Sequence, residues 1–416
     1  MGKLEPTNEA SAIAEQGGGR ATKVEQLIQQ YCPDGVEYKK IKEVYQRIKG
    51  TPITAGKMKE IQCPTGEIRI FAGGKTVIDA NEADIPNANI TRVPAVLVQS
   101  RGVIDAIYYD KPFTFKNEMW AYTHKEQTSV KFLYYVMKQN IQHFRDAASG
   151  MGALPQISLG TTEDFSIPVP PLPVQEEIVR ILDTFAELQA ELQAELQARL
   201  QQYNYYRDNL LSFEGRTDVE WKKLGDVASI KTGRRFVRTD IRESGVPCFH
   251  YGDLYTYYGL TATQTKGYLD AELASKLRFA QPNDVVVVCA GENDMDIGVG
   301  VAWLGNEPAV VHDACCILHH DQNPRYISHF LRTHNYHLQM KKYVKNGKIS
   351  SLPSSGLANA LIPIPSLEEQ ERIATILDKF YALTTDITTG LPAEIEARRK
   401  QYEYYRDQLL TFKQKA

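Results

Sequence analysis

Several features that often reveal the class of a protein are missing from this sequence. Its 416 residues include only six cysteines, which lack the spacing of a disulfide framework and fit reduced thiols in a cytoplasmic protein. No apolar run reaches the roughly 18 residues of a transmembrane helix. Residues 1–20 lack the basic and apolar regions of a signal peptide, and Gly17-Gly18-Gly19 predicts a disordered tail. We therefore expect a cytoplasmic protein of two to three domains.

The chain also lacks an excess of basic charge. Its net charge is −3, which argues mildly against a nucleic-acid-binding protein. Basic residues nevertheless gather locally, with seven in residues 222–242 against two acids, and four lysines in residues 341–348 without an acid. Acidic residues gather elsewhere, as in residues 368–371. This distribution permits basic recognition surfaces and acidic helices in one protein.

Motifs for catalysis are absent as well. A methyltransferase needs a glycine-rich cofactor turn and, for adenine, an Asn/Asp-Pro-Pro-Tyr motif, whereas Pro170-Pro171 stands without either. Gly73-Gly74-Lys75-Thr76 resembles the end of a P-loop, but Arg69 occupies the place of the first glycine. The acids of residues 33–39 fit a turn leading into a strand better than a nuclease site. Residues 312–320 lack zinc-ligand spacing and predict a strand, so we expect no catalytic residue and no metal site.

What the sequence does contain is an internal duplication. Four segments recur later in the chain: 36–44 as 219–227, 167–170 as 362–365, 175–185 as 370–380, and 203–211 as 402–410. These copies bracket residues 45–165, which we name head 1, and residues 228–360, which we name head 2. The sequences of the two heads do not resemble each other. Duplicated supports with different heads predict one scaffold that presents two recognition surfaces.

The duplicated segments include two long helices. Residues 174–212 contain no glycine or proline and place apolar residues at helical spacing, which predicts a helix roughly 57 Å long. From Ala186 the helix repeats the unit Ala-Glu-Leu-Gln, whose period of four turns the leucine stripe by about 40° per unit and excludes a long coiled-coil seam. A second helix, 368–412, is interrupted near Gly390. A helical hairpin that serves only stability would show a similar pattern.

Three motifs together resemble the specificity subunits of Type I restriction-modification systems. They are Ile-Pro-Val-Pro-Pro-Leu followed by Gln-Glu-Glu-Ile-Val-Arg-Ile-Leu-Asp, the Ala-Glu-Leu-Gln run, and Tyr-Asn-Tyr-Tyr-Arg-Asp-Asn-Leu-Leu-Ser-Phe, with second copies downstream. The resemblance is greatest to the subgroup whose spacer helix carries four-residue repeats, and Gly390-Leu391-Pro392 fits that subgroup too. The motifs cover less than a quarter of the chain, but their combination is specific.

The resemblance implies an α+β fold. Two α/β target-recognition domains are expected, separated by two long α-helices that form an antiparallel, coiled-coil-like pair. The expected boundaries are a disordered tail at 1–20, target-recognition domain 1 at 21–173, spacer helix 1 at 174–213, target-recognition domain 2 at 214–365, and spacer helix 2 at 366–416, broken near Gly390–Pro392.

The resemblance also implies a function. Each head is expected to read one half of a bipartite, asymmetric sequence in double-stranded DNA. Two methyltransferase subunits would dock on the helices and methylate adenine N6, and motor-nuclease subunits would complete the complex. This chain is expected to be non-catalytic and to bind no cofactor, whereas S-adenosylmethionine, ATP and magnesium belong to the partner subunits. A helical scaffold with two protein-binding heads is the alternative, and salt-sensitive DNA binding would distinguish the two. A free-standing nuclease or methyltransferase would instead be active alone.

The spacer helix allows a quantitative expectation. Four helical residues turn the chain by about 40°, and one base pair turns the DNA by about 34–36°. Adding or removing one Ala-Glu-Leu-Gln unit is therefore expected to change the unread gap by about one base pair.

Residues for DNA recognition are expected in loops, where forked, amide, hydroxyl and basic side chains can contact bases and phosphates. Each candidate would also fit an ordinary solvated loop. In head 1 the candidates are Gly73, Gly74, Lys75, Thr76, Gln99, Ser100, Arg101, Lys116 and Asn117. In head 2 they are Thr232, Arg234, Arg235, His250, Tyr251, Asp253, Glu292, Asn293, Lys345, Asn346 and Lys348. Packing is favoured for Tyr255, Tyr257 and Tyr258.

The helices carry candidates for helix pairing and methyltransferase docking, since aromatic residues are enriched in protein interfaces. The candidate partner-binding residues are Ile178, Ile181, Phe185, Leu192, Tyr203, Tyr206, Ile373, Ile376, Phe380, Tyr402 and Tyr405. The neighbouring Tyr205 and its copy Tyr404 are expected to share this role.

Overall fold

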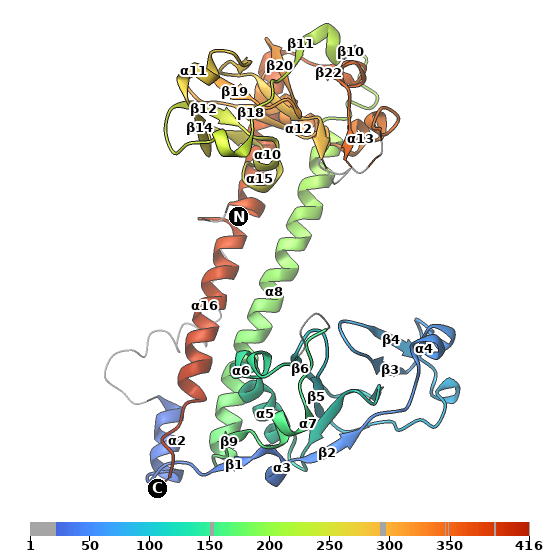
Figure 1. Ribbon diagram of the computed structural model, residues 1–416, viewed down its shortest axis with the longest axis vertical. Coiled ribbons are helices and arrows are strands. Elements are labelled where there is room, and N and C mark those ends of the chain that lie inside the picture. The colour runs from blue at the N-terminus through green and yellow to red at the C-terminus, as the bar shows by residue number, and fades with distance from the viewer. Residues whose placement is uncertain are drawn as a thin grey trace. The chain divides into compact units, whose positions relative to one another are not determined.

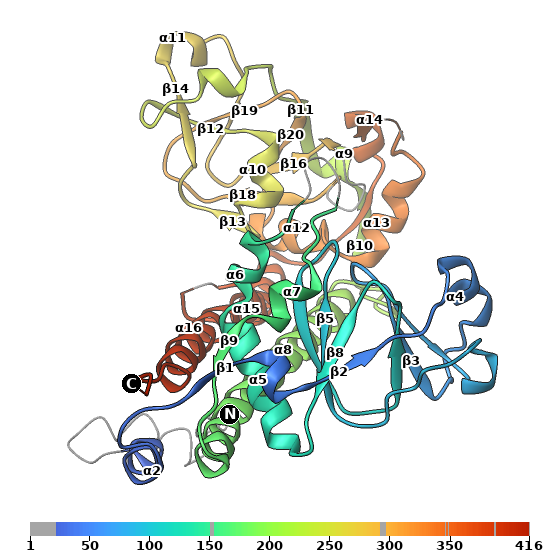
Figure 2. The same ribbon diagram turned by 60° about the horizontal axis from the view of Figure 1, so that its bottom comes forward.

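The computed structural model describes residues 22–149, 154–291, 297–345, 347, 349–386 and 388–415 (Figures 1 and 2). The chain divides into two compact units, of which unit 1 is Met1–Glu191 with Glu396–Ala416 and unit 2 is Leu192–Ile395. Unit 1 contains head 1, and unit 2 contains head 2. The tail expected at residues 1–20 lies outside the described residues. Among the described residues, no helix combines the length and apolar character needed to cross a membrane.

The long helix that follows the proline-rich stretch is α8, Leu172–Leu210, with 39 residues. It begins among prolines because the first helical turn does not need the N–H that proline lacks. The second helical region consists of α15, Leu367–Thr385, and α16, Leu391–Leu409. Between them, the carboxylate of Asp386 accepts a hydrogen bond from the backbone N–H of Thr388 at 2.7 Å. The second helix is thus interrupted where the sequence predicts it.

Head 1 is built on two small sheets. The first is antiparallel with the order β2-β8-β5-β6, and its strands are β2 Gln46–Lys49, β8 Trp120–Thr123, β5 Ala95–Gln99 and β6 Asp105–Tyr109 (Figure 2). The second has the order β4-β3-β7, in which β3 and β7 are parallel, with strands β4 Val77–Ala80, β3 Ile68–Phe71 and β7 Phe113–Phe115. The helix α5, Gln127–Gln139, packs on β5 and β6.

The core of unit 1 joins head 1 to the start of α8. Val96 and Val98 of β5, Phe132 of α5, and Ile178 and Leu182 of α8 belong to one buried cluster. Head 1 therefore cannot be separated from the first turns of α8 without exposing apolar surface. The remaining elements of unit 1 are α2 Lys23–Tyr31, β1 Tyr38–Lys40, α3 Ile41–Val44, α4 Ala55–Ile61, η1 Glu82–Asp84, α6 Ile141–Asp146, α7 Leu159–Glu163 and β9 Ser166–Pro168.

Head 2 also contains two sheets. The larger has the order β11-β20-β16-β18-β13, with β11 Ala228–Thr232, β20 Cys315–His320, β16 Val285–Val288, β18 Gly300–Trp303 and β13 Thr261–Ala262. The smaller has the order β14-β12-β19-β15, with β14 Gly267–Leu269, β12 Val246–Phe249, β19 Ala309–Val311 and β15 Phe279–Ala280. The helix α12, Pro324–Phe330, packs on β16 and β18.

The other elements of unit 2 are β10 Glu220–Lys223, α9 Leu224–Val227, η2 Arg238–Asp240, α10 Tyr251–Thr256, α11 Ala271–Ala274, β17 Ala290–Gly291, α13 His334–Lys341, β21 Ser350–Ser351, α14 Ser354–Leu357 and β22 Leu361–Ile364. The strand β20 pairs with a strand on each side and buries Cys315 and Cys316. Residues 312–320 therefore include a central strand, in agreement with the prediction from the sequence.

The two heads share one topology although their sequences differ. The order β11-β20-β16-β18 repeats β2-β8-β5-β6, and the parallel pair of β12 with β19 repeats that of β3 with β7. In each head, the strand that begins this order, β2 or β11, is followed directly by a glycine, Gly50 or Gly233. A Cβ atom would lie 2.1 Å from the carbonyl oxygen of Phe115 in head 1 and 2.2 Å from that of His312 in head 2. The same close backbone approach therefore requires glycine in both heads.

Each unit is completed by a helix segment from the other repeat. In unit 1, the rings of Phe185 in α8 and Tyr405 in α16 stack with centroids 5.4 Å apart. In unit 2, Phe380 of α15 and Tyr206 of α8 stack at 5.3 Å. Phe380 is the copy of Phe185, and Tyr405 is the copy of Tyr206, so the duplicated aromatic pairs form two equivalent contacts. The helices in each unit are therefore paired by the residues that the duplication preserves.

Candidate nucleic-acid interface

In head 1, three separate sequence segments meet at one edge. They are Gly73–Thr76 after β3, Gln99–Arg101 at the end of β5, and Lys116–Asn117 after β7, and together we name them the head 1 loop cluster. Gln99 Nε2 donates a hydrogen bond to the carbonyl oxygen of Gly74 at 2.9 Å, and the N–H of Gly74 donates to the carbonyl oxygen of Arg101 at 3.2 Å. The structure thus brings together all the head 1 candidates, which lie in separate segments of the sequence.

The members of the head 1 loop cluster differ in exposure. Gln99 and Ser100 are buried, and Ser100 Oγ donates a hydrogen bond to the carbonyl oxygen of Glu118. These two side chains therefore fix the loops rather than face solvent. Lys75, Thr76, Arg101 and Asn117 are exposed, whereas Lys116 is half-buried and its Nζ lies 2.9 Å from the Glu118 carboxylate. The exposed side chains supply the hydrogen-bond donors that contacts with phosphates and bases require.

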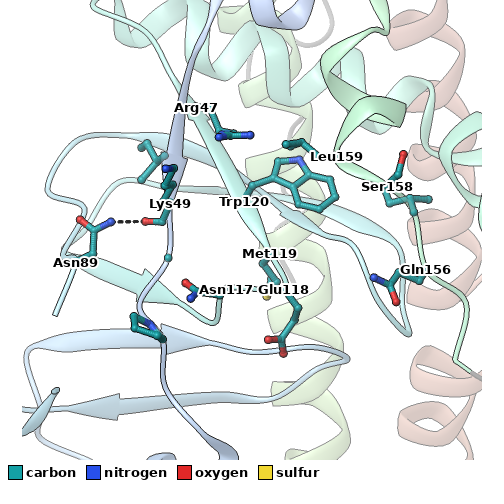
Figure 3. A pocket seen from close by; sticks show the side chains of 14 residues that line it. Arg47, Lys49, Asn89, Asn117, Glu118, Met119, Trp120, Gln156, Ser158 and Leu159 are labelled. Carbon is teal, nitrogen blue, oxygen red and sulfur yellow. Dashed lines mark hydrogen bonds between the residues drawn. The ribbon is translucent and has the colours of Figure 1, made fainter. Parts of the chain in front are cut away.

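Beside the loop cluster, head 1 contains an open polar cavity of about 670 Å³ (Figure 3). Polar side chains around it come from β2, from the segment before β5, from the turn after β7 and from the segment before α7, and they are Arg47, Lys49, Asn89, Asn117, Gln156 and Ser158. One wall is Trp120, whose Nε1 donates a hydrogen bond to Thr162 Oγ1 at 2.9 Å. Of these residues, only Asn117 was a candidate from the sequence. The alternation Gln46-Arg47-Ile48-Lys49 was the available signal, because it gives a strand with a polar face.

Head 2 has a corresponding group of loops, which we name the head 2 loop cluster. It consists of His250–Tyr251 after β12, Ala290–Gly291 after β16, His312–Asp313 after β19, and Arg235–Arg238 after β11. These segments surround a cavity of about 390 Å³. The rings of His250 and His312 lie 4.9 Å apart, and Tyr251 lies 5.1 Å from His312. Aromatic rings and exposed arginines thus take the place of the amide and lysine side chains of head 1.

Burial determines the charge of the two histidines in this cavity. It lowers the pKa of His250, with Asp253 acting in the opposite direction and Arg238 adding to the decrease. It also lowers the pKa of His312, where Asp313 opposes and His250 adds to the decrease. Both imidazoles are therefore neutral at pH 7, and a neutral imidazole offers one donor and one acceptor.

The remaining head 2 candidates that the structure describes form separate contacts. Arg234 donates to the carbonyl oxygen of Lys276 at 2.8 Å, and the carbonyl oxygen of Thr232 accepts from Arg278. Asp253 forms an ion pair with Lys266 at 2.9 Å. Lys345 is exposed, and its backbone pairs with Ser351. The other candidates lie outside the described residues, and they are Glu292, Asn293, Asn346 and Lys348.

The three neighbouring tyrosines of head 2 depart in part from the packing predicted for them. Tyr258 is half-buried, and its ring lies 5.1 Å from that of Phe249 in the core. Tyr255 lines the head 2 cavity and is 37% exposed, and Tyr257 is 61% exposed. The packing prediction is therefore wrong for Tyr257, because the end of α10 turns its side chain out to solvent.

Comparison with known proteins identifies the family. The model of the Type I restriction modification DNA specificity domain matches the chain twice, at residues 33–202 and 217–397. The chain belongs to this family. The specificity subunit of the Type I restriction enzyme EcoR124I/EcoR124II of Escherichia coli is 35% identical over 298 residues, which are 69% of this chain and 72% of that protein. A putative Type I specificity subunit of Haemophilus influenzae is 33% identical over 321 residues, covering 71% of this chain and 77% of the relative.

Solved structures support the same fold. The S subunit of a Type I restriction-modification system from M. genitalium has a TM-score of 0.52 at 16% identity, covering 90% of this chain and 95% of that one. A chain from a structural study of complex assembly in a Type I system has a TM-score of 0.51 at 16% identity, covering 90% and 97%. The expected fold of two heads with long helices is therefore confirmed. As a Type I specificity subunit, the chain recognises DNA sequence and is a non-catalytic component.

The partner-binding candidates on the helices are mostly in contact with the chain itself. The buried members are Ile178, Ile181, Phe185, Leu192, Tyr203 and Ile373, the half-buried members are Ile376, Phe380, Tyr402 and Tyr405, and Tyr206 is 39% exposed. Their predicted role in helix pairing agrees with these positions, and their role in partner docking stays a prediction. Tyr205 and Tyr404 differ from them, since they are 65% and 62% exposed and occupy equivalent positions in the two repeats.

Within the described part of the chain, no three His, Cys, Asp or Glu side chains are arranged to hold a metal ion.

Proposed function

We propose that the two heads read the two halves of a bipartite, asymmetric sequence in double-stranded DNA. The observation that carries the proposal is the pair of loop clusters. Both clusters lie at the ends of corresponding strands in the same topology, yet their side chains are unrelated. Two frameworks that share a strand order but carry different exposed side chains suit the recognition of two different short sequences.

The chemistry of each loop cluster supports this proposal. Head 1 offers Lys75, Arg101 and Asn117 in exposed positions, and head 2 offers Arg235 and Arg238. Arginine and asparagine can form paired hydrogen bonds with guanine and adenine, and lysine contacts phosphate. These side chains come from turns, so they can change without disturbing the strand pairing behind them.

The complex in which the chain acts is a further part of the proposal. We infer that two methyltransferase subunits dock on the helices, around the equivalent and exposed Tyr205 and Tyr404. S-adenosylmethionine, ATP and magnesium belong to the partners, which methylate adenine N6 and, as motor-nuclease subunits, restrict unmodified DNA. The chain itself supplies the two half-site contacts and the helices that hold them at a set distance. The similarity to specificity subunits of Type I enzymes supports this assembly.

Mapping of modified adenines tests the proposal. Cells expressing the chain with its methyltransferase subunit are expected to carry N6-methyladenine at one bipartite motif. Changing Arg101 and Asn117 together to alanine should relax one half of the motif, and changing Arg235 and Arg238 to alanine should relax the other half. Lys59→Ala, on the exposed face of α4, is the matched control. A single continuous motif, or an effect of both double variants on the same half, would contradict the proposal.

Salt dependence separates the proposal from the protein-binding alternative. Each lost phosphate contact should reduce the slope of log affinity against log salt by about one, because counterions are released on binding. Binding of the assembled complex to DNA that does not depend on salt would favour a scaffold with protein-binding heads.

A further inference from the structure

The duplication places an aspartate at the same position of α8, which packs on head 1, and of α15, which packs on head 2. Asp183 of α8 and Asp378 of α15 end the repeated Ile-Leu-Asp motif. In unit 1, Lys131 Nζ lies 2.6 Å from Oδ2 of Asp183, and Tyr135 Oη donates to Oδ1 at 2.5 Å. Lys131 and Tyr135 lie one helical turn apart on α5, so one carboxylate binds two successive turns of a helix in head 1.

Unit 2 repeats this arrangement with different side chains. Arg325 Nη1 lies 2.6 Å from Oδ2 of Asp378, and His329 Nε2 lies 2.9 Å from Oδ1. Arg325 and His329 again lie one turn apart, now on α12 of head 2. The helices α5 and α12 pack on corresponding strands of their heads, namely β5 and β16. The two contacts are therefore equivalent, although the residues that form them differ in type.

A tyrosine from the other repeat completes the contact in unit 2, and its copy lies near the contact in unit 1. Tyr203 Oη lies 3.1 Å from Nδ1 of the fully buried His329, and its copy is Tyr402. Burial and the charges of Tyr134 and Asp183 together raise the pKa of Tyr402 to about 12, with Arg406 acting in the opposite direction. In unit 2, one proton on His329 Nε2 satisfies both ring nitrogens, because Nε2 donates to Asp378 and Nδ1 accepts from Tyr203. We name the two groups, each centred on its aspartate, the aspartate junctions.

The aspartate junctions supply the directional part of interfaces that are otherwise apolar. Phe132, Val136, Ile178 and Leu182 share the buried cluster between α5 and α8, and the hydrophobic effect among such residues does not favour one orientation over a slightly rotated one. Charge-assisted hydrogen bonds need defined distances and angles. The four charged partners expose 24–32% of their side chains, so solvent screens these pairs less than pairs on the open surface.

We propose that Asp183 and Asp378 are positioning residues, which fix the orientation of each head on its helix and thereby the number of base pairs between the two half-sites. They do so without contacting DNA. This inference rests on the proposed function, because the gap is defined only if each head reads one half-site. It adds that the helices alone do not determine the gap, since each head must also be held at a defined angle on its helix.

The experiment uses the full chain expressed with its methyltransferase subunit. Asp183→Asn and Asp378→Asn remove the charge and keep the shape of the side chain. In each variant both half-sites should stay unchanged, while methylation at sites whose gap differs by one base pair should rise roughly tenfold, the effect of losing one charge-assisted hydrogen bond. The control is Glu272→Gln, which removes an exposed ion pair with Lys276 on head 2. This control should leave the gap distribution as in the unmodified chain.

A charge exchange makes the test stricter. Lys131→Asp combined with Asp183→Lys restores an ion pair in the opposite direction, and it should return the gap to a single value relative to Lys131→Asp alone. If the two aspartates only stabilised the fold, the variants would lose folded protein or the recognition of one half-site. The distribution of gap lengths would not become wider. An unchanged gap in both Asn variants, or a loss of half-site recognition, overturns the inference.

Hydrogen exchange separates this inference from the proposed function. If the unmodified complex methylates no bipartite motif, the proposed function fails. Amide exchange still tests the aspartate junctions in that case. Asp183→Asn should speed exchange in α5, and Asp378→Asn in α12, roughly tenfold, with the strands of each head unaffected. Equal exchange in the variants and the unmodified chain would show that the junctions do not hold the heads.

Discussion

At the turn after β7, head 1 carries Lys116 paired with Glu118, whereas at the corresponding turn after β19 head 2 carries His312 packed against His250. The strands that lead to these turns correspond in order and direction. Strand positions are constrained by backbone hydrogen bonds and by core packing, and turn positions are not. One framework can therefore support two unrelated recognition surfaces when variation is confined to the ends of its strands.

The largest expected effect comes from the glycine that both frameworks share. In Gly50→Ala or Gly233→Ala, the new Cβ would overlap a backbone carbonyl oxygen, which cannot move without breaking strand pairing. Each change should destabilise its own unit by about 3 kcal/mol and remove recognition of one half-site only.

Thermal unfolding and mapping of modified adenines measure both effects. Gly56→Ala in α4 is the control, since its Cβ would meet no atom closer than 4.0 Å and alanine favours a helix. If Gly50→Ala and Gly233→Ala weaken the same half-site, the equivalence of the two heads is wrong.

The next effect addresses the helix rather than the heads. Deleting Ala190–Gln193 removes one four-residue unit from α8 and leaves the residues of both loop clusters in place. The gap in the methylated motif should change by about one base pair, with both half-sites retained. Deleting only Ala190 and Glu191 is the control, because a turn of about 200° should abolish methylation instead of shifting the gap. A motif with its original gap after the four-residue deletion would count against a helical determinant of spacing.

A smaller effect concerns the pH dependence of stability, which should differ between the two units. Burial lowers the pKa of five histidines in unit 2, namely His250, His312, His320, His329 and His337. Their folded pKa values lie below the unfolded value, so the unfolded chain binds more protons and stability falls as the pH drops below about 6.5. At His329, Asp378 opposes this decrease, whereas Arg332 and Arg207 add to it.

Limited proteolysis at pH 7.5 and 5.5 is the measurement. Cleavage within unit 2 should increase more at the lower pH than cleavage within unit 1. His320→Gln, which keeps a polar side chain that does not titrate, should reduce the difference. Equal sensitivity of the two units would contradict this prediction.

The smallest effect concerns single phosphate contacts. Lys75→Ala in head 1 should weaken DNA binding of the assembled complex several-fold for every sequence tested, and reduce the salt slope by about one. Titration of DNA at two salt concentrations measures both quantities. A change confined to one DNA sequence would instead assign the side chain to base recognition.

Much of the helical scaffold could be predicted from the sequence. The run without glycine or proline from residue 174 gives α8, and the Gly-Leu-Pro segment gives the interruption between α15 and α16. The candidate site was predicted less completely. Gln99 and Ser100 were expected to face DNA, but the structure buries both, since a polar side chain at the end of a strand can equally bond a neighbouring loop. Arg47 and Lys49 were missed because a short exposed strand gives a weak pattern.

The sequence by itself determined the duplication, the helices and the family, because helical periodicity and repeated motifs are local and survive as residue order. Only the tertiary structure decided that the two heads share a topology and that Lys131 and Arg325 serve equivalent aspartates. These relations join residues 52 or 53 positions apart through packing. Backbone hydrogen bonding preserves such a framework while the side chains on it change, so the equivalence does not follow from the residue types alone.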